Sequence, residues 1–142
     1  MEADRRAALE QICNAMGVSI LYAFGSRARE IYDWLEARRP HLSPGPSDVD
    51  IGARAAAGTI WSVMDKVRLA QALEALFDVP RVDLVVLNEA DPFLAAEVIR
   101  GERLFAHDEH EADEYDLYVL RRAGDLAPLE RERLDLIFAR AP

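Results

Sequence analysis

Hydrophobic and polar positions change their spacing several times along the chain, and these changes divide it into short elements. Apolar residues recur at helical spacing over about residues 3–16, and Gly17 is expected to end that helix. Residues 18–24 form a continuous apolar run with β-branched and aromatic members, which predicts a buried strand. A second helix is expected to begin at Ser26 or Arg27. The inward side of this helix consists of Ile31, Trp34 and Leu35.

The middle of the chain continues the alternation of strands and helices. Residues 39–47 contain three prolines and a glycine and predict a loop. Two further strands are expected at residues 48–54 and 82–87, and residues 59–77 predict a strongly amphipathic helix between them. Its apolar positions are Ile60, Val63, Met64, Val67, Leu69, Ala70, Leu73 and Leu76. Trp61 and Met64 are expected in the core.

The C-terminal part is expected to be mainly helical. Residues 92–100 predict a helix with a proline near its start, and residues 103–106 predict a short strand. Residues 108–140 are polar and helical, and Gly124 and Pro128 are expected to break them into two helices.

Strands that alternate with helices indicate an α/β fold. We expect a small mixed or mainly parallel sheet flanked by helices, with the C-terminal helices packed at one side. The chain has 142 residues, of which 51% are apolar, and this is enough for one core. We therefore expect a single domain over residues 1–142, with its core at about residues 18–106 and a helical tail at about residues 108–140.

Composition and charge narrow the possible functions. The formal charge of −9 argues against contact along nucleic-acid phosphates, which requires a basic surface. Cys13 is the single cysteine, so we expect no internal disulfide and no cysteine metal cluster. The charged N-terminus does not resemble a signal peptide, and no apolar run approaches the roughly 20 residues of a membrane span. These features favour a cytoplasmic protein.

Three aspartates carry the candidate chemistry. Asp48 and Asp50 lie two positions apart on a predicted strand, so their side chains share one face of the sheet. Asp83 lies inside another predicted strand. Such carboxylates are the hard ligands that Mg²⁺ prefers, and two ions can clamp the attacking and leaving oxygens of an in-line displacement. Asp83 can also take the proton of an acceptor hydroxyl. The alternative is that Asp48 caps a turn and the other two are surface acids.

A glycine and a serine follow the first predicted strand. Gly25 allows close approach of the backbone and a positive φ angle. The free N–H groups of the next helix turn and the Ser26 hydroxyl can bind the β- and γ-phosphates, and Arg27 or Arg29 can assist near the leaving pyrophosphate. A Gly-Ser pair alone is more often a plain strand-to-helix turn. Its position before Asp48 and Asp50 favours nucleotidyl transfer from a Mg²⁺-bound nucleoside triphosphate.

Three segments of the chain resemble the minimal nucleotidyltransferases (MNT) of the DNA polymerase beta-like superfamily, which are often paired with HEPN-domain toxins. They are Phe24–Arg29, Ser47–Ile51 and Val82–Leu84, and residues 99–105 also resemble the helix-to-strand segment that follows the third acid there. The resemblance implies the nucleotidyltransferase fold, two Mg²⁺ ions and transfer of AMP from ATP. It further implies that Gly25 and Ser26 hold the triphosphate, that Asp48 and Asp50 bind metal and that Asp83 is the third carboxylate.

The chain departs from the family pattern at two places. Glu30 stands where the family usually has glycine, and the span from Ser26 to Asp48 is longer than usual. The extra segment, around residues 31–46, carries Trp34 and three prolines. It can shape an acceptor site, cover the nucleotide or pack on a partner, or it can be a passive extension of the helix.

Three functions fit these residues. The leading hypothesis is transfer of AMP to a protein acceptor, a HEPN-type toxin that is thereby neutralised. The second is a small-molecule nucleotidyltransferase of the antibiotic-modifying kind, although such enzymes usually carry an added substrate-binding domain. The third is a non-catalytic antitoxin of the same fold, against which the intact acid triad speaks.

A protein acceptor requires a contact surface, which we expect on the Trp34 segment and the C-terminal helices. Tyr115 and Tyr118 share a helix face and are interpreted either as packing residues or as part of a protein interface. Ile137 and Phe138 are expected at the same surface. The negative net charge favours a basic partner.

Overall fold

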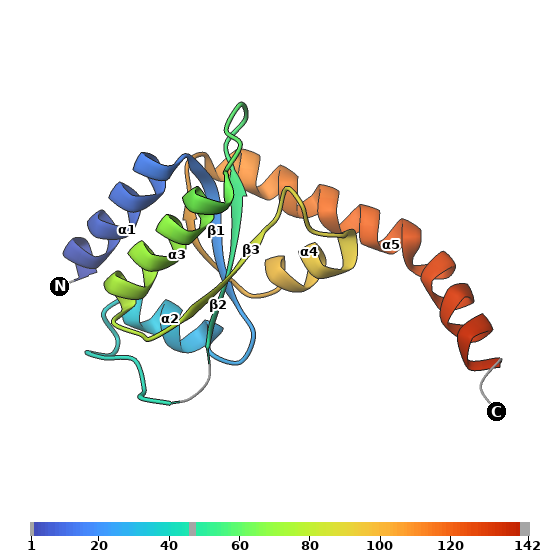
Figure 1. The fold of residues 1–142 in the computed structure, drawn as a ribbon, viewed down its shortest axis with the longest axis horizontal. Coiled ribbons are helices and arrows are strands. Elements are labelled where there is room, and N and C mark those ends of the chain that lie inside the picture. The colour runs from blue at the N-terminus through green and yellow to red at the C-terminus, as the bar shows by residue number, and fades with distance from the viewer. Residues whose placement is uncertain (1, 46–47, 140–142) are drawn as a thin grey trace.

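The computed structural model describes residues 2–45 and 48–139, which form alternating helices and strands (Figure 1). In chain order these are α1 (Glu2–Met16), β1 (Val18–Phe24), α2 (Ala28–Leu35), β2 (Val49–Ala55), α3 (Val63–Phe77), β3 (Val82–Val86), α4 (Pro92–Ile99), β4 (Glu102–Ala106) and α5 (Glu109–Ala139). The predicted order of elements is confirmed as far as β4. Ser47, part of the second motif, and Pro46 of the predicted loop lie outside the described residues.

The strands form one mixed sheet in the order β3-β2-β1-β4. β1 runs antiparallel to both β2 and β4, whereas β2 and β3 are parallel. The parallel pair is joined through α3, because parallel neighbours need a crossover that reaches back over the sheet. The α/β class with a mixed sheet is therefore confirmed.

Helices cover both faces of the sheet (Figure 1). One face packs against α1, α2 and α3, and its buried residues include Cys13, Ile31, Leu35, Leu69, Leu73 and Phe77. The other face packs against α4 and α5, and its buried residues include Ile20, Tyr22, Val98, Ala112 and Val119. The central strands β1 and β2 thus have helices on both sides, which explains the nearly continuous apolar run of β1.

α3 begins later than its apolar pattern predicts. Ser62 and Asp65 form a reciprocal capping box that starts the helix at Val63. Trp61 is buried as predicted, and its Nε1 donates to the Met16 carbonyl at 2.8 Å. The prediction that Met64 is a core residue is wrong, because Met64 lies in the first turn of α3 and is 57% exposed. Other predicted apolar positions at this end of the helix are also exposed, namely Ile60, Val63 and Val67.

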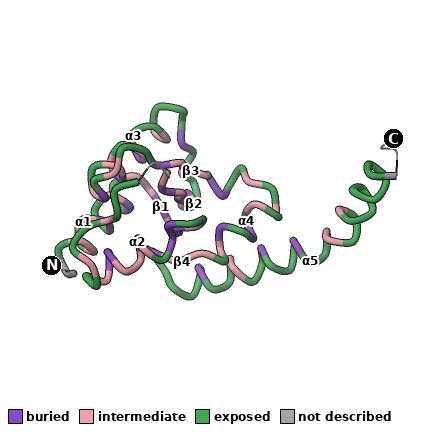
Figure 2. Tube along the Cα trace, turned by 90° about the horizontal axis from the view of Figure 1, so that it is seen from below, coloured by how far each residue is buried: buried purple, intermediate pink, exposed green. Residues whose placement is uncertain are grey.

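α5 is one continuous helix of 31 residues with Pro128 inside it. The predicted break at Gly124 and Pro128 is therefore wrong. A proline removes one backbone donor, but the residues around it are mostly Leu, Ala, Glu and Arg, which have high helix propensity. The last turns extend away from the sheet, and Figure 2 shows exposed and half-buried positions there. No helix of the described residues has the length and apolarity needed to cross a membrane.

The first half of α5 is fixed to the sheet by a polar cluster. Arg103 of β4 forms ion pairs with Glu109, Asp113 and Asp116 at 2.8–2.9 Å. Asp116 also accepts a hydrogen bond from the Tyr22 hydroxyl of β1. Burial, together with this carboxylate, raises the pKa of Tyr22, so the hydroxyl remains a donor.

The end of α2 and the segment after it pack onto the body of the protein. Trp34 is 8% exposed and meets Phe77 edge-to-face with 5.6 Å between ring centroids. The Arg5 guanidinium lies over the Trp34 ring at 4.5 Å and donates to the carbonyls of Trp34, Arg39 and Pro40. The indole of Trp34 is therefore unavailable as a contact residue for a partner, contrary to the expectation for this segment.

Two glycines permit close packing beside the sheet. A Cβ atom at Gly52 of β2 would clash with Val98 of α4, and one at Gly101 would clash with the backbone carbonyl oxygen of Ala23. Gly124, in contrast, has nothing within 4 Å of such an atom. The glycines at 52 and 101 thus set how closely α4 and the following turn approach the central strands.

We expect Gly101→Ala to lower the free energy of unfolding by about 1–3 kcal/mol, because the added methyl must displace backbone. Gly124→Ala is the matched control. It should raise the stability by about 0.5–1 kcal/mol, because alanine is the better residue in an open helical position. Chemical denaturation of both variants measures the difference. Equal stability of Gly101→Ala and the parent protein would contradict the close approach.

Candidate active site

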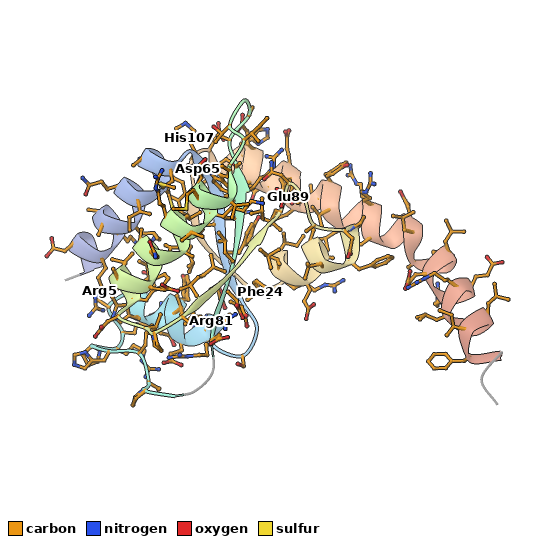
Figure 3. All side chains as sticks on the ribbon, in the orientation of Figure 1. Arg5, Phe24, Asp65, Arg81, Glu89 and His107 are labelled. Carbon is orange, nitrogen blue, oxygen red and sulfur yellow. The ribbon has the colours of Figure 1, made fainter. Side chains whose placement is uncertain are left out.

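The three aspartates lie at one end of two neighbouring parallel strands. Asp50 of β2 pairs with Asp83 of β3 and, on its other side, with Phe24 of β1. Asp48 directly precedes β2. Figure 3 shows Phe24 and Arg81 at this end of the sheet and His107 at the other. The fold thus places Asp83 next to Asp48 and Asp50, although it is far from them in sequence.

Gly25 brings the turn after β1 close to these acids. Its φ angle is +75°, in the region that favours glycine, and a Cβ atom there would clash with the Asp50 carboxylate oxygen Oδ2. Ser26 is exposed in the same turn, and the Ala28 N–H donates to the Gly25 carbonyl at 3.3 Å as α2 begins. The predicted phosphate-binding turn therefore directly adjoins the predicted metal ligands.

The electrostatic environment of Asp50 is unfavourable to its charge. Burial raises the pKa of this carboxyl, and the negative charges of Asp83, Asp48 and Glu97 raise it further. No ion pair to Asp50 is present among the described residues. A cation bound at this position would relieve the repulsion.

Arg81 is one residue of the site that sequence reasoning missed. Its guanidinium reaches Asp83 Oδ1 at 3.2 Å and Asp48 Oδ2 at 3.7 Å, so it bridges two of the three acids. The sequence does contain an indication that Arg81 lies near Asp83. Arg81 precedes Asp83 by two positions, and residues two apart in an extended chain point to the same side. The side chain is 68% exposed, so this contact can be broken at little cost.

Glu97 is the second missed residue. It lies on α4 and contributes to the raised pKa of Asp50, after burial and the other two acids. The packing of α4 beside the central strands, with Val98 against Gly52, brings it there. No local sequence pattern links Glu97 with Asp50.

The two predicted arginines have different surroundings. Arg27 is 8% exposed, pairs with Glu30 at 3.1 Å and donates to the Ser43 carbonyl at 2.7 Å. Arg29 is exposed and pairs with Asp33 at 3.3 Å and Glu102 at 3.5 Å. Their contact with a nucleotide remains a prediction.

Glu30, which replaces the usual glycine, fixes the loop that follows α2. It accepts hydrogen bonds from Arg27 and from the Ser43 N–H. Burial opposes its charge, but these hydrogen bonds outweigh that effect and lower its pKa. The departure from the family pattern therefore has a structural role in this chain.

The donor atoms at this end of the sheet suit a hard divalent cation. In the part of the chain that the structure describes, no group of three His, Cys, Asp or Glu side chains is gathered tightly enough to hold a metal ion. The residues nevertheless fit one, because their ligand atoms are carboxylate oxygens and the charge of Asp50 is uncompensated. Asp48, Asp50 and Asp83 are the ligand candidates.

Solved structures with the same architecture define the class of fold. The chain is similar to one in a toxin–antitoxin complex with AMP-PNP, at a TM-score of 0.70 and 18% identity over 94% of this chain and 98% of that one. It is also similar to a chain in the structure of a tri-AMPylated Shewanella oneidensis HEPN toxin in complex with an MNT antitoxin, at a TM-score of 0.67 and 18% identity over 97% and 99%. These likenesses establish the nucleotidyltransferase fold.

A further solved structure, described as a minimal nucleotidyltransferase, is 31% identical over 70% of this chain and 87% of that one, with a TM-score of 0.51. The chain belongs to the minimal nucleotidyltransferases. No protein-family profile matches it, and no curated protein matches it significantly.

We expect Asp50→Asn to raise the melting temperature of the ligand-free protein by a few degrees at pH 7, because it removes a charge that faces other acids. The folded pKa of Asp50 lies above its ordinary value of 3.8. Ionised Asp50 therefore destabilises the folded protein above the folded pKa, and this penalty vanishes as the pH falls below 3.8. The gain should shrink accordingly when melting is measured from pH 7 down to pH 3.5 in EDTA.

The exposed Asp125 of α5 provides the control, since Asp125→Asn removes the same charge away from the site. An unchanged or lower melting temperature for Asp50→Asn at pH 7 would contradict the electrostatic assignment.

Proposed function

We propose that this protein is a Mg²⁺-dependent nucleotidyltransferase that transfers AMP from ATP to a HEPN-type toxin and thereby acts as its antitoxin. The observation that carries the proposal is the placement of Asp50 opposite Asp83 with Gly25 against the Asp50 carboxylate. Nucleotidyl transfer needs carboxylates as metal ligands and a turn whose N–H groups can bind phosphates, close to one another. We further propose that the protein acts in the cytoplasm.

The similar complexes support both the nucleotide and the acceptor. One contains AMP-PNP, an ATP analogue, and another contains a HEPN toxin that carries three AMP groups. The chain covers nearly the whole of the matched chain in each case. Because identity is 18%, the fold alone is shared, and the activity is inferred from the residues at the site.

Each site residue has a proposed role. Asp48, Asp50 and Asp83 would hold Mg²⁺, which supplies positive charge to the phosphate oxygens and the acceptor oxygen. The turn at Gly25 and Ser26 would bind the β- and γ-phosphates through backbone N–H groups and the serine hydroxyl. Arg27 and Arg29 would assist, and to do so Arg27 must exchange its contacts with Glu30 and Ser43.

The transfer is an in-line displacement at the α-phosphorus. The acceptor hydroxyl oxygen forms a bond to this phosphorus while the bond to the α–β bridging oxygen breaks and pyrophosphate leaves. We assign the hydroxyl proton to Asp83, which is 44% exposed and so accessible to an acceptor. The Arg81 guanidinium must leave the acids when a metal binds, since it bridges Asp48 and Asp83.

We expect Asp50→Asn and Asp83→Asn to differ in their effects. Asp50→Asn should weaken Mg²⁺-dependent ATP binding about tenfold or more, because a charged metal ligand is lost. Asp83→Asn should bind ATP nearly normally but transfer AMP about 100-fold more slowly, because the proton acceptor is lost. Calorimetry gives the affinity and labelled ATP gives the rate, with Asp125→Asn as control. Parallel loss of binding and transfer in Asp83→Asn would instead make Asp83 an ordinary ligand of the nucleotide-bound metal.

We expect co-expression with the HEPN-type protein of the neighbouring reading frame to add AMP groups to that protein. Its intact mass should rise by one AMP group or a multiple, and the rise should vanish with Asp50→Asn. Purified protein should be incubated with ATP, Mg²⁺ and an aminoglycoside in parallel. An unmodified partner with a modified aminoglycoside would favour a small-molecule enzyme, and no modification of either would favour an antitoxin that acts by contact alone.

A further inference from the structure

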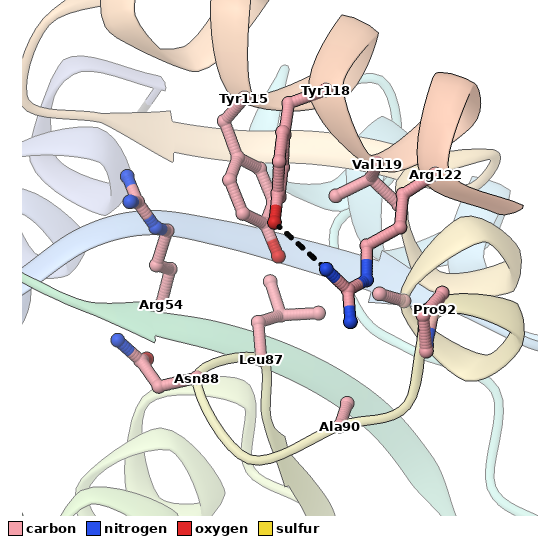
Figure 4. Close-up of a pocket in the computed structure, with 10 residues that line it drawn as sticks. Arg54, Leu87, Asn88, Ala90, Pro92, Tyr115, Tyr118, Val119 and Arg122 are labelled. Carbon is pink, nitrogen blue, oxygen red and sulfur yellow. Dashed lines mark hydrogen bonds between the residues drawn. The ribbon is translucent and has the colours of Figure 1, made fainter.

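A cavity of about 350 Å³ lies near the end of the sheet that is opposite the acids (Figure 4). It is bounded by the ends of β2 and β3, the start of α4 and one side of α5. Its lining consists of Arg54, Leu87, Asn88, Ala90, Pro92, Ala95, Tyr115, Tyr118, Val119 and Arg122. This volume falls within the range of small-molecule sites.

The charge of this cavity is opposite to that of the whole protein. The chain has a net charge of −9, yet the lining contains two arginines and, among the described residues, no carboxylate. Neither Arg54 nor Arg122 forms an ion pair with a carboxylate of the described chain, whereas Arg81 and Arg103 do. Two guanidinium groups without carboxylate partners in one cavity indicate an anionic ligand.

Two tyrosines lie next to the arginines in the lining of the cavity (Figure 4). The Arg54 guanidinium lies over the Tyr115 ring at 4.6 Å, and Arg122 Nη1 donates to the Tyr118 hydroxyl at 3.4 Å. Tyr118 is 56% exposed, so its ring can receive a planar group. Burial raises the pKa of Tyr115 to about 12, although Arg54 opposes this, so its hydroxyl is a donor at neutral pH.

A second cavity adjoins the first and shares Arg54, Tyr115 and Tyr118 with it. Beyond these residues it is lined by Glu111 and Glu114 of α5, together with His107. Carboxylates accept hydrogen bonds from amino groups. The two cavities together therefore provide cations for an anionic group, an aromatic surface for a ring and acceptors for an amino group.

We propose that this paired cavity binds a phosphorylated nucleoside whose base carries an amino group. The guanidinium groups of Arg54 and Arg122 bind the phosphate, the base stacks on Tyr118, and its amino group faces Glu111 and Glu114. Stacking on an aromatic side chain suits any base, because every base has a π face. The site lies at the other end of the sheet from Asp50, so it requires neither Mg²⁺ nor transfer activity.

The test is calorimetric titration of the full chain with AMP in EDTA, which removes metal-dependent binding at the acids. We expect saturable binding that Arg54→Gln and Arg122→Gln each weaken about tenfold or more. Arg131→Gln is the matched control, because Arg131 is an exposed arginine of α5 outside both cavities. Arg122 is exposed, so its substitution leaves the fold intact even if Arg54→Gln unfolds the protein.

Inorganic phosphate and adenosine, titrated separately, distinguish the two halves of the ligand. Each should bind more weakly than AMP, because each makes only part of the contacts. If inorganic phosphate binds as tightly as AMP, the proposed role of the base is overturned. If adenosine binds as tightly as AMP, the proposed role of the arginines is overturned. The site itself is overturned if AMP does not bind, or if Arg122→Gln binds AMP as well as the parent chain does.

Discussion

Asp50 and Asp83 pair across the parallel strands β2 and β3, where burial and the neighbouring negative charges oppose the ionisation of Asp50. A protein that brings two acids together without a counter-charge gives up stability. Here Arg81 partly compensates by reaching Asp48 and Asp83, but Asp50 has no such ion pair among the described residues. The arrangement is therefore better suited to a bound cation than to the ligand-free protein.

Close packing around these acids depends on positions without a side chain. Gly25 lets the turn after β1 touch the Asp50 carboxylate, and Gly52 seats α4 on β2 so that Glu97 comes near it. Gly101 lets the chain pass over the backbone of β1. Each close approach concentrates functional groups in a small region, and larger residues there would separate them.

The two ends of the sheet differ in how their charged side chains are arranged. The end with Asp48, Asp50 and Asp83 has excess negative charge, whereas the other end has Arg54 and Arg122 in a cavity without carboxylates. α5 contributes to the second end through its first half, which Arg103 fixes to the sheet. The cavity thus depends on the same polar cluster that orients the C-terminal helix.

The sequence by itself determined the order of elements and the identity of the acids, because strand alternation and the Asp48–Asp50 spacing are local properties. Three short segments also indicated the family, and a solved structure that is 31% identical to the chain shows the same family. Tertiary structure decided the rest. Met64 is exposed because a capping box fixes where α3 starts, and α5 continues through Pro128 because the flanking residues support it. The sequence does not indicate that Glu97 and Arg122 belong to a site. Packing brings them next to residues from distant segments, and contacts of that kind leave no periodic pattern in a sequence.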